Sequence, residues 1–204
     1  MDKKDLHKFR FDFLTKAIED TQHTVRFTDG KAGAVITFWG IILTSIFRTN
    51  ESWYPWLKAV DGFPDRFFVY SCIFFLLFFF VRSIWIALKV ITPKINPLAQ
   101  INCSGYEPKG LFYLHQLDNG ITGKHLFHDR ALPKLTMTTA DYMDKLKDTK
   151  EEDILCELTI ELQKVSFIRN VKVARVNDAI NSVKLFLVVF GVLFLYGFCD
   201  TFFR

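Results

Sequence analysis

The stretch that decides the fold is residues 67–88, FFVYSCIFFLLFFFVRSIWIAL. It is an almost unbroken run of apolar side chains, and its one charged residue is Arg82. A helix of this length covers roughly 33 Å at about 1.5 Å per residue, which is enough to cross a hydrocarbon core about 30 Å thick. The run is too long for an ordinary buried helix, so it predicts an integral membrane protein.

Two weaker apolar runs flank this stretch, residues 32–47 and 185–199, and each is about five residues short of the usual twenty. Either could be a buried helix of a soluble domain. In a membrane-bound chain, however, the long side chains of Lys31, Lys184 and Arg204 can reach the headgroups and extend the run. We therefore expect two to three transmembrane helices.

The expected organisation has four parts. They are an amphipathic helix over residues 1–31, a transmembrane hairpin over 32–91, a cytosolic segment over 92–184, and a third transmembrane helix over 185–204. The fold class is an all-α membrane protein with a helical and loop-rich cytosolic segment.

Composition excludes several classes of function. The 23 Phe residues gather in the apolar runs, which indicates contact with lipid rather than stacking on bases. A net charge of +4 is too small to predict binding to nucleic acid. The four cysteines, Cys72, Cys103, Cys156 and Cys199, lack metal-ligand spacing, so we expect free thiols and no cofactor.

The N-terminal segment has helical periodicity. Leu6, Phe9, Phe13 and Ala17 recur at intervals of three and four residues, and the opposite face is charged. Two interpretations are open: the helix packs on a neighbouring helix, or it lies on the inner leaflet of the membrane.

Residues 48–66 carry Trp53, Tyr54 and Trp56 beside two prolines and predict an interfacial loop with an aromatic belt. The three basic and three acidic residues of this loop cancel. Lysines and arginines gather instead before the first run, after the second and before the third. The positive-inside rule then places the N-terminus and residues 92–184 in the cytosol, and the loop and the C-terminus outside.

The cytosolic segment is expected to begin irregularly, because residues 92–133 hold four Pro and four Gly. A short helix over about 138–148, capped by Thr138 or Thr139, is expected to follow. Acidic residues then open a longer helix near Lys150. This helix meets no Pro or Gly before the third apolar run, so it predicts one rod that couples a binding event to the membrane.

Few residues suggest chemistry. Arg82 lies inside its apolar run and either serves function or snorkels to the inner headgroups. His115, His125, His128 and Asp129 suggest a metal site of the kind found in HD phosphohydrolases, but nearby glycines disfavour the helical frame that such ligands need. We therefore expect no enzyme activity.

The tetrapeptide from Asp29 to Ala32 stands where the amphipathic helix meets the first apolar run. It is either a plain turn, with Lys31 reaching the headgroups, or a motif. A second run that ends before a Pro, the aromatic pair Phe112 and Tyr113, and a long helix bearing Gln163 follow in order. This order resembles the transmembrane effectors of Pycsar antiphage systems, over about residues 8–195.

The resemblance implies a bacterial antiphage effector in the inner membrane that spans it several times. Such an effector senses cUMP or cCMP made by a partner cyclase and then impairs the membrane, which causes abortive infection. A homo-oligomer is expected, because two or three spans enclose no pore and small residues such as Gly33, Ala34 and Gly40 permit close helix packing. A constitutive channel or scaffold, and a membrane-anchored HD-type phosphohydrolase, are the alternatives.

A site for a cyclic nucleotide needs a cation or amide donors for the phosphate and an aromatic or apolar face for the base. The candidates in the cytosolic segment are Phe112, Tyr113, His115, Gln163, Arg169, Lys172 and Arg175. The three basic residues among them could equally be anchors at the inner leaflet.

Overall fold

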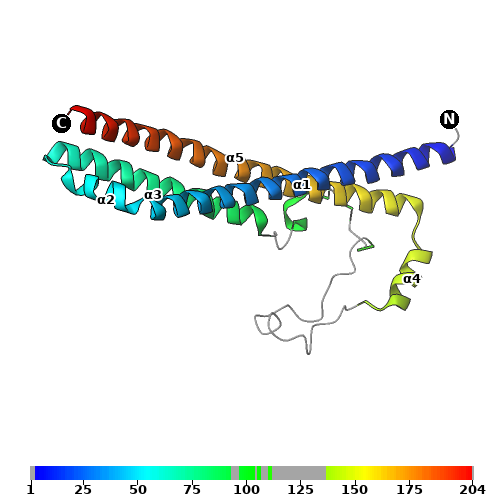
Figure 1. Cartoon of the computed structure of the whole chain (residues 1–204). Helices are drawn as coiled ribbons and strands as arrows, with labels where there is room; N and C mark the ends of the chain where they lie inside the picture. Colours follow the sequence, from blue (N-terminus) through cyan, green and yellow to red (C-terminus); the bar gives the residue numbers. More distant parts are fainter. Residues whose placement is uncertain (1–2, 93–96, 104, 107–109, 112–136, 204) are drawn as a thin grey trace. The chain divides into compact units, whose positions relative to one another are not determined.

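The computed structural model describes residues 3–92, 97–103, 105–106, 110–111 and 137–203. Their regular structure is entirely helical (Figure 1) and comprises α1 (Lys3–Arg48), α2 (Asn50–Ala59), α3 (Phe63–Ile91), the 3₁₀ turn η1 (Leu98–Gln100), α4 (Thr139–Lys147) and α5 (Glu151–Phe203). The predicted all-α class is confirmed, and α1, α3 and α5 are each long and apolar enough to cross a membrane.

The chain divides into two compact units. Unit 1 comprises Met1–Gln22 and Asn96–Phe167, and unit 2 comprises His23–Ile95 and Ile168–Arg204. Both α1 and α5 contribute residues to each unit.

The prediction of a turn at Asp29 to Ala32 is wrong, because α1 continues through these residues without interruption. Each glycine inside a helix costs about 1 kcal/mol relative to alanine; Gly30 lies within this stretch and Gly33 directly follows it. Tertiary packing offsets that cost, since Ala32 is fully buried and Asp29 is paired with a residue of α5. The amphipathic segment and the first apolar run are therefore one helix.

The prediction of a loop over residues 48–66 is also wrong in part, because α2 occupies ten of these residues. Glu51 in its first turn and Lys58 in its last turn suit the helix dipole. Pro55 lies inside this short helix and removes one backbone hydrogen bond without ending it. The turns in this segment are at Thr49, between α1 and α2, and in the residues before α3, where Gly62 has φ +92°.

Unit 2 contains α2 and a bundle of α1, α3 and α5. Its buried core is built from residues of all three helices: Ala32, Val35, Trp39, Ala87, Val90, Val176, Ala179 and Phe186. The ring of Trp39 lies 5.1 Å from that of Phe80 and 4.6 Å from that of Phe186, both edge to face. Phe68 and Tyr196 meet farther along, at 5.1 Å, so α3 runs antiparallel to α5.

Unit 1 contains η1, α4 and the ends of α1 and α5. Thr138 caps α4 as predicted, in a capping box with Asp141. The hydroxyl and backbone N–H of Thr138 donate to the Asp141 carboxylate, which lowers the pKa of that group. On α5, the buried Glu157 accepts a hydrogen bond from the backbone N–H of Gly110, at 3.0 Å.

Candidate functional site: an interhelical polar network

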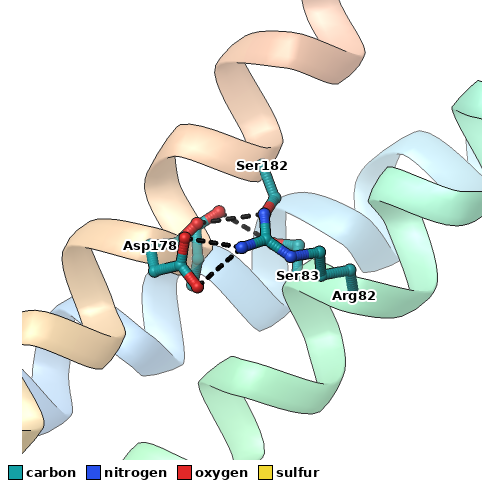
Figure 2. Close-up of polar contacts among 5 residues, drawn as sticks. Arg82, Ser83, Asp178 and Ser182 are labelled. Carbon is teal, nitrogen blue, oxygen red and sulfur yellow. Dashed lines mark hydrogen bonds and ion pairs between the residues drawn. The ribbon is translucent and has the colours of Figure 1, made fainter.

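The guanidinium of Arg82 is bound to α5 inside the three-helix bundle of unit 2. One of its nitrogens donates to both carboxylate oxygens of Asp178, at 2.7 and 2.8 Å, and the other donates to the hydroxyl of Ser182 at 2.8 Å. Figure 2 shows the guanidinium lying between these two side chains. Arg82 therefore does not snorkel along its own helix; it reaches sideways to α5.

The helical spacing of the acceptors explains this geometry. Asp178 and Ser182 are four residues apart, so they lie one turn above the other on the same face of α5. The planar fork of an arginine can bind both at once. A charge this deep in a membrane costs about 3 kcal/mol on insertion scales, and an opposite charge offsets part of that cost.

A second contact beside this pair joins all three helices. The indole Nε1 of Trp39 donates to the hydroxyl of Ser83 at 2.9 Å, and Ser83 in turn donates to the carbonyl of Ala179 at 3.1 Å. Trp39 and Ser83 are almost completely buried. Because every polar atom in this chain of bonds has a partner, the network stabilises one alignment of α1, α3 and α5.

A second ion pair joins α1 to α5. The Nζ of Lys172 lies 2.6 and 2.8 Å from the carboxylate oxygens of Asp29. One turn along α5, the guanidinium of Arg175 donates to the carbonyl of Lys89 at the end of α3, at 2.7 Å. Both neighbouring helices are thus attached to the same stripe of α5 by charged groups.

Comparison with protein families decides the classification. A model of the Pycsar effector protein domain matches residues 13–198. The chain belongs to the Pycsar effector family. Its role is therefore antiphage defence, and its three apolar helices fit a membrane protein. No curated protein and no solved structure matches the chain.

The predicted site residues of this Pycsar effector lie in different parts of the structure. Asp29 and Lys172 bind each other, and Arg175 holds the end of α3. Lys31 lies over the ring of Phe27, 4.6 Å from its centroid. Ala32 belongs to the buried core.

The remaining candidate residues have fewer side-chain partners or lie outside the described residues. Gln163 is exposed on α5, and the guanidinium of Arg169 bonds to the neighbouring Asn170 side chain at 3.2 Å. Phe112, Tyr113 and His115 lie outside the described residues, as do His125, His128 and Asp129. Within the described part of the chain, no three metal-ligating side chains gather, and all four cysteines are free.

Sequence reasoning missed Asp178, Ser182, Ser83 and Trp39 as parts of the network. A signal was present for one of them. Asp178 is the only acidic residue between Glu161 and Asp200, and Arg82 is the only charge in residues 67–88. A charge inside an apolar helix predicts a partner of opposite charge on a neighbouring helix. The two serines carry no comparable signal in the sequence.

Proposed function

We propose that this Pycsar effector crosses the bacterial inner membrane with α1, α3 and α5, senses cUMP or cCMP in the cytosol, and then impairs the membrane so that the infected cell stops growing. The observation that carries the proposal is the family match, which extends over residues 13–198 and so includes parts of both units. The protein acts as a sensor and effector with no catalysis of its own.

The contacts of α5 support a register of this helix in the membrane, that is, which of its residues lie at the two interfaces. The ion pair of Asp29 and Lys172 marks a charged level, and the ring contact of Phe68 with Tyr196 marks an aromatic level. About 36 Å of α5 separates Lys172 from Tyr196, which fits a hydrocarbon core about 30 Å thick with aromatic side chains at its outer interface. This register starts the third span near residue 173 rather than at residue 185, and it places Lys184 within the span. The lysines and arginines at the charged level then face the cytosol.

Arg169 is the cation that we propose for the nucleotide phosphate. Lys172 and Arg175 already hold α1 and α3 through bonds of 2.6 to 2.8 Å. Among the described residues, the guanidinium of Arg169 has only the adjacent Asn170 side chain as its partner, so it retains donors for a phosphate.

Activation follows from the position of the ion pairs. Asp29 and Arg82 both bind α5, through Lys172 and Asp178. A movement of α5 along α1 and α3 would break both pairs and so lead to a second arrangement of the bundle, as helix shifts do in other switching proteins. Nucleotide favours that second arrangement only if it binds it more tightly than the first.

Thermal unfolding of the purified protein in detergent tests nucleotide sensing. Addition of cUMP or cCMP is expected to raise the melting temperature, whereas cAMP and cGMP leave it unchanged, because a ligand that binds only the native state stabilises it. Arg169→Ala is expected to abolish the shift, while the control Arg26→Ala, at an exposed position on α1, retains it. No shift with any nucleotide would favour a constitutive channel or scaffold.

A further inference from the structure

One exposed face of α5 in unit 2 carries three polar side chains, those of Asn177, Asn181 and Lys184, and we name it the polar face of α5. The spacing of four and three residues places them on one side of the helix, within about 60° of arc. Within the described part of the chain, none of the three side chains has a hydrogen-bond or ion-pair partner. Their polar groups are therefore free to bind something that the bundle itself does not supply.

Lys184 lies well inside the apolar part of the bundle. Arg82 of α3 binds Ser182 of α5, and because the two helices are antiparallel, Lys184 is level with about Phe80, two residues along each helix. From Phe80 to Leu88, the near end of the apolar run, is about 12 Å of helix, and the far end is more distant. The four methylene groups of a lysine do not span this distance, so Lys184 does not reach the headgroups by snorkelling.

An ammonium group at this depth needs either an acidic partner or water, because lipid tails supply neither. The nearest acidic residue on α5 is Asp178, and its carboxylate already binds Arg82 at 2.7 Å. The carboxamides of Asn177 and Asn181 likewise forfeit hydrogen bonds when hydrocarbon surrounds them. Water along the polar face of α5 would satisfy all three side chains at once.

Polar side chains also face outward on α1, but these do not need water. Thr37, Thr44 and Ser45 each donate a hydroxyl hydrogen to a backbone carbonyl one turn earlier in α1, at 3.1, 2.8 and 2.9 Å. A hydroxyl that bonds within its own helix is compatible with lipid tails. The polar face of α5 differs because its charge and its two carboxamides make no such bond among the described residues.

We propose that the polar face of α5 lines a water-filled passage in the membrane, and that Lys184 makes the ion flow through it selective for anions. Three helices enclose no pore, so the passage lies between several copies of this chain, and water separates their Lys184 charges. Rings of lysine or arginine line pores that pass anions, and a lining of one sign concentrates ions of the opposite sign. Arg82 neutralises Asp178, so Lys184 sets the net charge. The proposal rests on the proposed membrane-spanning arrangement and on the proposed permeabilisation by nucleotide.

Thiol labelling in isolated membranes, without nucleotide, tests for water on this face. In a chain with its four native cysteines replaced by alanine, Asn181→Cys is compared with Thr37→Cys. Both positions are exposed and lie at similar depth, nine residues beyond Lys172 and eight beyond Asp29, which bind each other. N-ethylmaleimide reacts with the thiolate, which forms in water and not among lipid tails, so Asn181→Cys is expected to be labelled and Thr37→Cys largely spared. Equal labelling at the two positions, or none at Asn181→Cys, would overturn the proposal.

Reversal potentials in planar bilayers test the role of Lys184. With cUMP or cCMP present and a gradient of potassium chloride across the bilayer, the wild-type current is expected to favour chloride over potassium about tenfold. Lys184→Gln is expected to remove most of this preference, and Lys184→Glu to favour potassium. Lys145→Gln is the control and is expected to keep the wild-type selectivity, since Lys145 is exposed on α4, outside the three candidate spans. Unchanged selectivity in both Lys184 variants would refute the role of this charge.

The two assays separate the passage from nucleotide sensing. Labelling needs no nucleotide, so it tests the passage even in a protein in which no nucleotide triggers a current. Labelling confined to Asn181→Cys without any thermal shift by nucleotide would remove only the sensing proposal. A normal thermal shift with equal labelling at Asn181→Cys and Thr37→Cys would remove only the passage.

Discussion

One nitrogen of the Arg82 guanidinium donates to both carboxylate oxygens of Asp178, at 2.7 and 2.8 Å, and joins α3 to α5. This pair changes the expected behaviour of Arg82 variants. From the sequence alone, Arg82→Leu removes an unfavourable charge from the membrane and should insert at least as well as the wild type. In the structure, the same change leaves the Asp178 carboxylate unpaired.

We therefore predict that Arg82→Leu and Asp178→Leu each lower the melting temperature in detergent, and that the double variant recovers part of the loss. A double-mutant cycle is expected to give a coupling free energy of about 1 kcal/mol or more, because removal of one partner leaves the other charge uncompensated. Additive effects of the two changes would show that the pair contributes nothing to the fold.

The Asp29 and Lys172 pair predicts a charge-swap effect. Asp29→Lys and Lys172→Asp each place like charges at the contact between α1 and α5 and should destabilise the protein. The combined exchange restores opposite charges and is expected to recover most of the melting temperature. Lys31→Asp is the control, since Lys31 is exposed and contacts a ring rather than a carboxylate. A swap that recovers nothing would contradict the pairing.

Glycine substitutions test the packing of α2 on α5. A Cβ at Gly197 would come within 3.1 Å of the Trp56 ring, whereas one at Gly30 meets nothing within 4 Å. Helix propensity alone favours alanine over glycine by about 1 kcal/mol. Gly30→Ala is thus expected to raise the free energy of unfolding, and Gly197→Ala to gain less or to lose. Equal stabilisation by both would mean that Trp56 does not pack there.

The proposed membrane topology predicts which positions a membrane-impermeant thiol reagent reaches in intact cells. In the background without native cysteines, Glu51→Cys on α2 is expected to be labelled from outside, and Lys145→Cys on α4 only after the cells are opened. Both native side chains are exposed, so burial in the protein does not protect either position. Labelling of Lys145→Cys in intact cells would contradict a cytosolic location for the sensing segment.

Sequence patterns predicted the apolar helices of this protein better than the contacts between them. Residues 67–88 predict α3 because length and hydropathy are properties of one segment, and the Thr138 cap is likewise local. The continuity of α1 through Asp29 could not be predicted locally, because its pairing with Lys172 depends on a residue 143 positions away. The hydrogen bond between Arg82 and Ser182 likewise joins residues 100 positions apart and could not be predicted locally.

In the candidate nucleotide site, too, the sequence predicts residue types but not the contacts that they make. Residue type identified Arg169, Lys172 and Arg175 as cations near a membrane, but only the packing of α5 on α1 and α3 separates those with helix partners from Arg169. Identical residue types on one helix can therefore serve different purposes, which the sequence does not distinguish.

The central claim is that nucleotide makes this protein permeabilise a membrane, and dye release from liposomes measures that step directly. The purified protein is reconstituted into vesicles that contain a self-quenching dye, and cUMP or cCMP is added from outside, where part of the protein population exposes its sensing segment. We predict release on addition of cUMP or cCMP, none with cAMP, and none from vesicles that lack protein. Release that is equal with and without nucleotide, or no release in protein shown to bind it, would contradict the account.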